Sequence, residues 1–415
     1  MQSTDLNSNL LFFDEAISEK LTFSEIVDYV SNPLLFSRVY NEKSTKGFIL
    51  NFIAGLINHR PVYLVDLNSS ENEIKRLIGE IKPEFVEEIH VKRNFSSFKD
   101  LLDAIRSSQS DLIMFTSGTT GEPKKIIHKI DSFLRSVKTG SENTNKVWGL
   151  CFSITHMAGL QVFFQAFFNQ CPLIHLYQYK KSEIEKLIGS FSITNLSGTP
   201  TFYRMLMPLS GSFNSVSQIT LGGEKSSSTL VDQLKLFFPK ARITNIYAST
   251  ESGSILKSSG EFFEIKKEFS SKITIIDNEL CVHKDLVGKG ISIDENGWYH
   301  TGDIVEIIEQ NPIKLKFLHR KTDAINVGGI KVDPTEIEEE LLKHPNIKLA
   351  RVYGRKNSIL GNIVMAEIVC IEDKQLSELE IKDFLSETLQ EFKIPRIIKI
   401  VDNIEITQSG KTKKI

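Results

Sequence analysis

The stretch Thr116-Ser-Gly-Thr-Thr-Gly-Glu-Pro-Lys124 decides the fold of this chain. Gly118 and Gly121 permit backbone conformations in which main-chain N–H groups turn toward an anion. Further donors come from three hydroxyls and one ammonium, those of Ser117, Thr119, Thr120 and Lys124. The preceding residues 111–115, Asp-Leu-Ile-Met-Phe, are apolar after the first and predict a buried strand. Because open α/β sheets bind ligands where a strand ends, the stretch predicts a phosphate-binding loop.

Composition alone leaves a second interpretation of this loop open. Most loops rich in Gly, Ser and Thr are surface turns without a ligand. The stretch also lacks the Gly-Lys-Ser/Thr of P-loop NTPases at the required spacing, which disfavours that class. The interpretation therefore depends on which motifs follow the loop along the chain.

Four further segments follow the loop, and with it they resemble the signature motifs of the adenylate-forming enzymes in the order of that family. The segments are Tyr247-Ala-Ser-Thr-Glu251, Tyr299-His-Thr-Gly-Asp303, residues 319–338 and Ser409-Gly-Lys411. The family comprises acyl-CoA synthetases, aryl-CoA ligases, peptide-synthetase adenylation domains and luciferases. The resemblance implies an α/β fold with a large layered N-terminal domain and a small mobile α+β C-terminal domain. On this basis we expect an adenylation domain over residues 1–320 and a small domain over residues 321–415.

The resemblance implies ATP-dependent activation of a carboxylic acid to an acyl-adenylate, with release of pyrophosphate. Transfer to a thiol would follow and give an acyl- or aryl-CoA thioester. The implied cofactors are ATP, Mg²⁺ and CoA. Two alternatives stay open: a ligase that loads the phosphopantetheine of an acyl carrier protein, and a non-catalytic nucleotide-binding relative. Pyrophosphate release that requires a carboxylic acid would distinguish an active ligase from such a relative.

Roles for single residues follow from the same resemblance. The loop of residues 116–124 would bind the β- and γ-phosphates and pyrophosphate. Thr250 would contact phosphate, and Glu251 would hold Mg²⁺ together with Thr119, since this hard cation prefers oxygen ligands. Asp303 would accept hydrogen bonds from the ribose hydroxyls. Arg320 would contact ribose or phosphate.

The remaining implied site residues surround the adenine ring and the reacting carboxylate. Gly222, Gly223, Glu224 and Tyr247 would flank the nucleotide. Lys411 would bring its ammonium to the carboxylate oxygen and the α-phosphate, offsetting their repulsion. His156, in the segment Phe152-Ser-Ile-Thr-His-Met-Ala-Gly-Leu160, would form a wall of the carboxylate pocket. Residues 151–160 contain no Asp to bind a substrate ammonium, which favours a simple aryl or acyl acid over an amino acid.

Rotation of the small domain about a hinge is a further implication of the resemblance. Alignment on Arg320 places Thr322 at the pivot, with Asp323 next to it, and either residue can be the hinge. Gly328 and Gly329 would lie where the thiol enters. The chain departs from the family pattern at Ala248, which stands where the family has Gly, and at Asn278-Glu-Leu280, which stands where it has Gly-Glu-Leu.

Charge and cysteine content exclude several other classes. The 415 residues include 50 basic and 52 acidic ones, so nothing indicates nucleic-acid binding. The four cysteines form no Cys-x-x-Cys pair, which disfavours zinc ribbons and disulfide frameworks and fits the cytoplasm. Residues 151–176 are apolar but interrupted by polar side chains, which predicts a buried helix and strand and no membrane span.

Periodicity predicts a layered α/β domain followed by a small α+β unit. Strands are predicted at residues 61–67, 147–153, 172–176, 193–197 and 219–221, and helices at residues 71–81 and 226–238. In the small unit a helix would begin with Asp333 as N-cap, Pro334 at the first position and Glu336 completing a capping box. A second helix would begin at Ser377 with Glu380. Strands are predicted at residues 347–353, 363–371 and 396–401.

Overall fold

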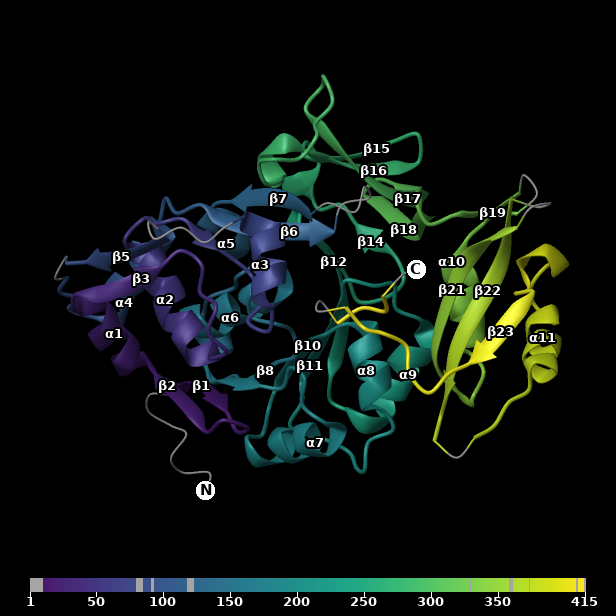
Figure 1. Cartoon of the computed structure of the whole chain (residues 1–415), viewed down its shortest axis with the longest axis horizontal. Coiled ribbons are helices and arrows are strands. Elements are labelled where there is room, and N and C mark those ends of the chain that lie inside the picture. The colour runs from purple at the N-terminus through teal and green to yellow at the C-terminus, as the bar shows by residue number, and fades with distance from the viewer. Residues whose placement is uncertain are drawn as a thin grey trace.

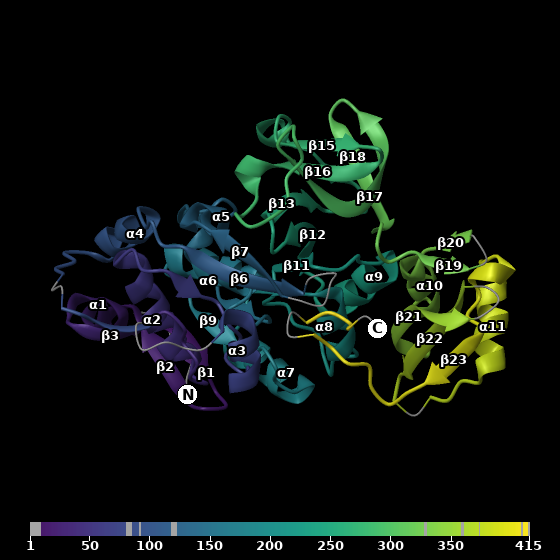
Figure 2. The same ribbon diagram turned by 45° about the horizontal axis from the view of Figure 1, so that its top comes forward.

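The computed structural model describes residues 10–79, 85–90, 93–117, 123–327, 330–357, 361–372, 374–407 and 410–413. Figure 1 shows a large part and a small part, with the small part at the right. The last stretch of chain, yellow in Figure 1, leaves β23 (Ile397–Ile400) and returns to α8 (Pro200–Leu206) of the large part. Figure 2 shows the same return from another side. The described chain up to Lys413 therefore returns to the boundary between the two parts.

An eight-stranded sheet forms the centre of the large part, in the order β13-β12-β11-β10-β8-β9-β1-β2. Its inner strands are parallel, and the outermost pairs, β12 with β13 and β1 with β2, are antiparallel. The strands are β1 (Leu10–Asp14), β2 (Glu19–Thr22), β8 (Trp148–Leu150), β9 (Leu173–His175), β10 (Asn195–Gly198), β11 (Gln218–Gly222), β12 (Arg242–Ser249) and β13 (Gly253–Ser258). The carboxyl ends of the parallel strands therefore share one edge, where such sheets bind ligands.

Two helices that are apolar on nearly every side form the largest core. They are α2 (Thr45–Ile57) and α6 (Met157–Phe168), and such helices are buried because no face suits water. Phe52 of α2 meets Phe163 and Phe164 of α6, and all three are fully buried. Burying each ring contributes about 1.5–3 kcal/mol. The predicted buried helix and strand within residues 151–176 are observed as α6 and β9. None of the helices in the described residues has the length and apolarity to cross a membrane.

Six further helices of the described residues lie around this sheet, and four of them begin after a Ser or Thr whose side chain caps the first turn. The four capped helices are α1 (Phe23–Ser31), α3 (Glu71–Ile78), α4 (Phe98–Arg106) and α9 (Ser228–Phe237), and the other two are α5 (Ile130–Leu134) and α7 (Lys181–Ser190). The predicted helices at residues 71–81 and 226–238 are thus α3 and α9. The strand predicted at residues 61–67 is much shorter, since β4 covers only Val62–Tyr63. There the Val65 N–H donates to the carbonyl of Tyr63 at 3.2 Å, and this tight turn ends the strand.

Three smaller sheets complete the described portion of the large part. In one, β4, β6 (Leu112–Ser117) and β7 (Pro123–His128) lie side by side. A pair consists of β3 (Leu34–Ser37) and β5 (Val86–Ile89). The third is antiparallel in the order β14-β18-β17-β16-β15. Its strands are β14 (Phe263–Glu264), β15 (Ile273–Ile276), β16 (Glu279–His283), β17 (Trp298–Gln310) and β18 (Ile313–Arg320).

The small part packs two helices on a sheet with the order β20-β19-β22-β21, to which β23 adds beside β22. The elements are β19 (Ile325–Val327), β20 (Ile330–Val332), α10 (Pro334–Leu341), β21 (Ile347–Asn357), β22 (Gly361–Cys370) and α11 (Glu378–Ser386). The predicted strands at residues 347–353, 363–371 and 396–401 are confirmed as β21, β22 and β23. Its core begins at Ile325. The domain boundary near residues 321–323 stays a prediction.

The two predicted helix starts of the small part have different outcomes. Ser377 and Glu380 form the predicted capping box of α11. Asp333 caps α10 by accepting from the Thr335 N–H at 2.9 Å, but the predicted capping box with Glu336 is wrong. The Glu336 carboxylate instead accepts from Lys393 Nζ at 2.7 and 2.8 Å, because this distant cation stabilises it more than a neutral N–H does.

Candidate active site

Lys411 lies directly against the glycine turn that ends β11. Gly223 has φ +85°, where other residues are strained, and a Cβ atom there would stand 2.8 Å from Lys411 Cε and displace that side chain. Burial lowers the pKa of Lys411, and the positive charge of Arg320 acts in the same direction. The carboxylates of Glu224, Glu251 and Asp303 oppose this shift. Five residues predicted from separate motifs are therefore electrostatic neighbours in the fold.

A tight hairpin carries Lys411, and we name residues 405–407 and 410–413 the C-terminal hairpin. The Thr407 N–H donates to the Lys411 carbonyl at 2.7 Å, and the Thr407 hydroxyl donates to the same carbonyl at 3.1 Å. The Gly410 N–H donates to the Thr407 carbonyl at 2.8 Å, and Gly410 has φ +76°. Glycine before the lysine thus permits the left-handed backbone that this turn requires. Ser409 lies outside the described residues.

The large part bonds this hairpin at two points beside Lys411. The hydroxyl of Thr199, which follows β10, donates to the Gly410 carbonyl at 2.5 Å. The Glu224 carboxylate accepts from the Thr412 N–H at 3.1 Å and from the Thr201 N–H of α8 at 3.0 Å. Both oxygens of Glu224 are thus bonded by the protein itself. The expected place of this residue beside adenine stays a prediction.

Asp303, Tyr247 and Arg320 converge at the start of the β17–β18 pair. Asp303 Oδ2 accepts from the Tyr247 hydroxyl at 2.6 Å, and Oδ1 accepts from Arg320 Nε at 2.8 Å. The two strands place Asp303 and Arg320 opposite each other. The Tyr247 ring stacks on Phe317, with centroids 4.3 Å apart and planes at 18°. The carboxylate is therefore held in one orientation before any nucleotide binds.

Burial and neighbouring charges shift the pKa values of the tyrosine and arginine side chains around Asp303. Burial and the neighbouring Asp303 carboxylate raise the pKa of Tyr247 well above its usual range, so the phenol stays a donor. Burial alone would lower the pKa of Arg320, but the Asp303 carboxylate raises it. Burial, and then the charge of Glu251, raise the pKa of Tyr299. Tyr299, Glu251 and Asp303 therefore lie within electrostatic reach of one another.

Backbone contacts fix the turn that contains Thr250 and Glu251. His128 Nε2 lies 2.7 Å from the Thr250 carbonyl, and since a carbonyl only accepts, this nitrogen carries the proton. The Gly288 N–H donates to the Glu251 carbonyl at 2.9 Å. Burial lowers the pKa of His128, so its ring is neutral. These bonds use main-chain atoms and leave the roles of both side chains as predictions.

Glu279 supports the Asp303 turn, a role that no sequence motif indicates. Its buried carboxylate accepts from the Gly302 N–H at 2.7 Å and from Lys321 Nζ at 3.4 Å. The Asp303 N–H donates to the Thr301 hydroxyl at 3.1 Å. The only local signal is Asn278-Glu-Leu280, where the chain departs from the family pattern. An acidic residue at the start of a strand does not reveal a partner 23 residues away.

The predicted phosphate loop is described only at its two ends. Thr116 and Lys124 face each other in the β6–β7 pair, as do Ser117 and Pro123 along the backbone. The strand predicted at residues 111–115 is thus confirmed as β6, and the Lys124 side chain is exposed. Gly118, Thr119, Thr120 and Gly121 lie outside the described residues, as do Gly328 and Gly329. Their proposed contacts stay predictions.

His156 contacts Asp66, a residue that none of the sequence motifs contains. His156 is the N-cap residue of α6, and its Nε2 lies 3.7 Å from the carboxylate of Asp66, whose side chain is 4% exposed. Burial would raise the pKa of Asp66, but the neighbouring His156 and the hydrogen bond from the Asn68 N–H lower it below its usual range. The aromatic Tyr203 of α8 is wholly buried in the core and donates to the Thr220 carbonyl at 3.4 Å. Phe202 packs partly buried against that core.

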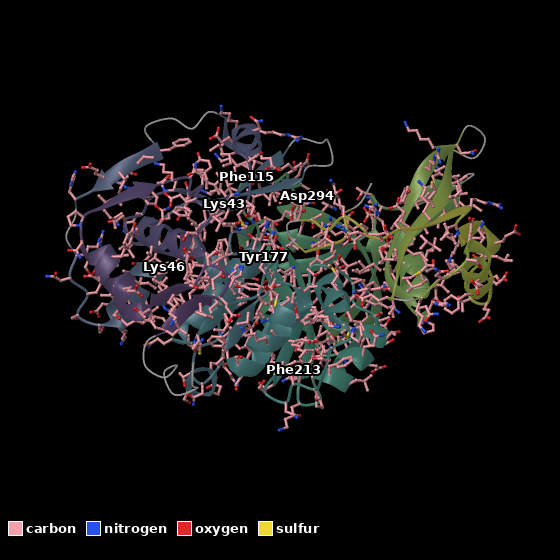
Figure 3. The ribbon with its side chains drawn as sticks, turned by 60° about the horizontal axis from the view of Figure 1, so that its bottom comes forward. Lys43, Lys46, Phe115, Tyr177, Phe213 and Asp294 are labelled. Atoms are coloured by element: carbon pink, nitrogen blue, oxygen red, sulfur yellow. The ribbon has the colours of Figure 1, made fainter. Side chains whose placement is uncertain are left out.

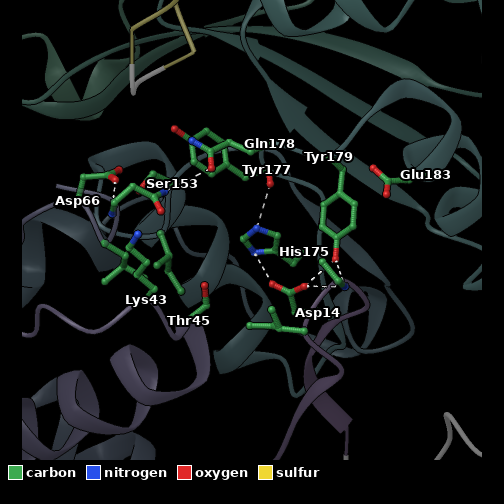
Figure 4. Close-up of a pocket in the computed structure, with 15 residues that line it drawn as sticks. Asp14, Lys43, Thr45, Asp66, Ser153, His175, Tyr177, Gln178, Tyr179 and Glu183 are labelled. Atoms are coloured by element: carbon green, nitrogen blue, oxygen red, sulfur yellow. Dashed lines mark hydrogen bonds and ion pairs between the residues drawn. The ribbon is translucent and has the colours of Figure 1, made fainter. Parts of the chain in front are cut away.

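A cavity of about 280 Å³ opens at the same sheet edge, beyond the ends of β1, β8 and β9 (Figure 4). Asp66 lines it together with Asp14, His175, Tyr177 and Lys43. Figure 3 places Lys43 and Tyr177 centrally in the large part. Asp14 accepts from the Tyr179 hydroxyl at 2.6 Å, and His175 lies 3.8 Å from its second oxygen. Through Asp66 the cavity adjoins His156.

The described residues fit a magnesium–nucleotide complex. Gly302 has φ +78°, and a Cβ atom added there would meet no other atom within 4 Å, so the chain leaves open space beside Asp303. No group of three or more His, Cys, Asp or Glu side chains among the described residues could hold a metal alone. Mg²⁺ commonly binds through one or two carboxylates and the phosphates of its nucleotide. Glu251 would supply the carboxylate.

Comparison with known families agrees with this site. The family of AMP-binding enzymes matches residues 64–286, and the C-terminal domain of AMP-binding enzymes matches residues 336–411. The first match alone spans more than half of the sequence. The chain belongs to the AMP-binding enzymes.

Curated relatives agree on the ligase class. A 2-succinylbenzoate–CoA ligase of Listeria monocytogenes is 26% identical over 336 residues, which cover 76% of this chain and 71% of that enzyme. A 4-coumarate:CoA ligase of Petunia hybrida is 25% identical over 351 residues, which cover 74% and 64% of the two chains. The predicted class, an adenylate-forming ligase with ATP, Mg²⁺ and CoA as the cofactors of that class, is confirmed.

Solved structures share the whole fold. ATP-bound MatB from Rhodopseudomonas palustris superposes with a TM-score of 0.74 over 98% of this chain and 95% of that one, at 17% identity. MenE from Bacillus subtilis, in complex with ATP and magnesium, gives 0.71 over 99% and 96%, at 18% identity. The predicted fold class, α/β with a large N-terminal domain and a small α+β C-terminal domain, is therefore confirmed.

Proposed function

We propose that this chain joins an aryl or acyl carboxylic acid to the thiol of CoA through an acyl-adenylate, with Lys411 as the catalytic cation. The observation that supports this most is the place of Lys411. It lies between the Gly223 turn and the charges of Glu224, Arg320, Glu251 and Asp303. An ammonium in that position offsets the repulsion between a carboxylate and the α-phosphate as the new bond forms.

The other site residues would bind different parts of the substrates: the ribose, the phosphates and the carboxylate. Asp303 would accept from the ribose hydroxyls, while Tyr247 and Arg320 hold its carboxylate. Thr250 would contact phosphate, and Mg²⁺ at Glu251 would neutralise phosphate charge. His156 would form one wall of the carboxylate pocket, held by Asp66. The loop of residues 116–124 would bind pyrophosphate through its N–H groups.

The names of the relatives support an aromatic acid and CoA as the substrates. Succinylbenzoate and coumarate are both aryl acids, and both named ligases use CoA. We place the enzyme in the cytoplasm, where its four free cysteines would stay reduced. A carrier-protein acceptor and a non-catalytic relative are outcomes that the experiment below separates.

A panel of aryl and alkyl carboxylic acids, scored for pyrophosphate with and without CoA, tests the proposal. We expect acid-dependent pyrophosphate release, and a CoA thioester by mass spectrometry when CoA is present. Lys411→Ala should suppress adenylation by about 10²–10³-fold, with ATP binding kept within a few fold. Adenylate without thioester would indicate a carrier protein. Full activity of Lys411→Ala would refute the catalytic assignment.

A further inference from the structure

The C-terminal hairpin is also bonded on its far side, by the small part. Arg351 of β21 donates from Nη1 to the Lys413 carbonyl at 2.8 Å. The same guanidinium donates from Nε to Glu367 Oε2 at 3.1 Å, and Nη2 bonds that oxygen too. The side chains of Arg351 and Glu367 are 12% and 13% exposed, so this pair is largely dry. Glu367 thus orients the Arg351 guanidinium independently of its bond to the hairpin.

Glu367 is itself held by more than one partner. It stands opposite Arg351 across the β21–β22 pair, and its second oxygen accepts from the Tyr353 hydroxyl at 3.1 Å. Burial would raise the pKa of Glu367, but the bonds from Arg351 and Tyr353 lower it. The carboxylate is therefore charged at neutral pH, and a charged acceptor orients the planar guanidinium strongly.

The two sides meet at the residues that flank Lys411. The large part bonds Gly410 and Thr412, through Thr199 and Glu224, and the small part bonds Lys413, through Arg351. The carbonyl of Lys411 itself accepts a hydrogen bond within the hairpin, from the Thr407 N–H. The Lys411 ammonium is therefore positioned by groups of both domains that bond backbone atoms of the residues around it.

We propose that Glu224 and Arg351 are positioning residues for Lys411, and this inference rests on the proposed function. Glu224 acts from the large domain and Arg351 from the small one. The two oxygens of Glu224 accept from the Thr201 and Thr412 N–H groups, so its carboxylate links α8 to the hairpin. Misplacing a catalytic group by about 1 Å costs up to about 10²-fold in rate, whereas binding of ATP to the large domain would hardly change.

A double-mutant cycle with Lys411 separates positioning from nucleotide binding. Glu224→Ala should lower kcat for pyrophosphate release about 10–100-fold, with KM for ATP within about threefold. In the Lys411→Ala background the same substitution should change the residual rate less than about twofold, because the group it positions is gone. Arg351→Met should behave in the same way. Equal losses in both backgrounds, or a raised KM for ATP as the main effect, would overturn the proposal.

Glu339→Gln is the matched control. Glu339 pairs with Lys225 at 3.0 Å, and this pair also joins the two domains but does not bond the hairpin. Its loss should change kcat less than about threefold. If it lowers kcat as much as Glu224→Ala does, general domain contact explains the effect and the proposal fails. Glu224→Gln, which keeps one acceptor oxygen, should fall between wild type and Glu224→Ala, and it replaces the alanine variant if that variant does not fold.

Hydrogen exchange provides a readout without any substrate. The Thr412 N–H donates to Glu224, so its exchange should accelerate at least about tenfold in Glu224→Ala while amides of β11 and β22 stay as in wild type. Unchanged exchange at Thr412 would overturn the proposal. If no acid supports pyrophosphate release by the wild type, the proposed function fails, and this exchange experiment still decides whether Glu224 holds the hairpin.

Discussion

Replacing Asp303 by alanine should destabilise the large domain by an amount that follows from its contacts. The side chain is 13% exposed and accepts one hydrogen bond each from Tyr247 and Arg320. A bond to a charged acceptor contributes about 1.5–3 kcal/mol, and the hydroxyl of the partly buried Tyr247 would lose this acceptor. Arg320 is 51% exposed and would be rehydrated, so its share is about 0–1 kcal/mol. The free energy of unfolding should therefore fall by about 1.5–4 kcal/mol.

Urea unfolding followed by circular dichroism measures this loss. Asp303→Asn should lose about half as much, because its amide oxygen still accepts from Tyr247. Asp285→Ala is the control, since this carboxylate is 49% exposed beside Lys272 and should change the free energy by less than about 0.5 kcal/mol. A loss for Asp303→Ala that matches this surface control would refute the view that the Tyr247 hydroxyl and Arg320 hold Asp303 in place. ATP affinity, measured by calorimetry, should fall in both Asp303 variants.

Three further predictions concern the lysine, its glycine and the supporting carboxylate. The ammonium of Lys411 must be present for catalysis and is lost as pH rises through its lowered pKa. The alkaline limb of the pH–rate profile should therefore lie below the value of about 10.4 of a free lysine, and a limb at that value would contradict the burial of Lys411. Gly223→Ala should lower the adenylation rate more than about tenfold, since its Cβ would displace Lys411, and stopped-flow pyrophosphate release checks this. Glu279→Ala leaves the Gly302 N–H without its acceptor and should cost about 1–3 kcal/mol in urea unfolding; an unchanged midpoint would show that water replaces the carboxylate.

Local patterns predicted the elements well, because their causes lie within a few residues. The capping box of Ser377 and Glu380, the β6 strand and the Asp333 cap of α10 all follow from neighbours along the chain. Glu336 shows the limit of such reasoning. Its local pattern fits a capping box, but a lysine 57 residues away offers a stronger, charged partner. No periodicity carries that information.

The candidate site divides in the same way. Motif order predicted which residues would gather, and the fold does bring Lys411, Glu251, Asp303 and Arg320 within electrostatic reach. The order of the motifs could not predict the residues that position these side chains. Two examples are Glu279 and Arg351, whose hydrogen-bond partners lie 23 and 62 positions away in the sequence. Those contacts exist only once two strands or two domains meet.

The irregular pairing of β17 with β18 has a consequence for insertions and deletions. The register shifts twice, between Asp303 and Val305 and between Ile307 and Glu309, before the strands reach their exposed connection at Asn311. Side chains alternate between the faces of a strand, so one residue removed between these shifts would turn Arg320 away from Asp303. A residue added at the exposed connection would leave that pair in register. Insertions at the exposed connection of this hairpin should therefore be tolerated, whereas deletions near Asp303 and Arg320 should abolish nucleotide binding.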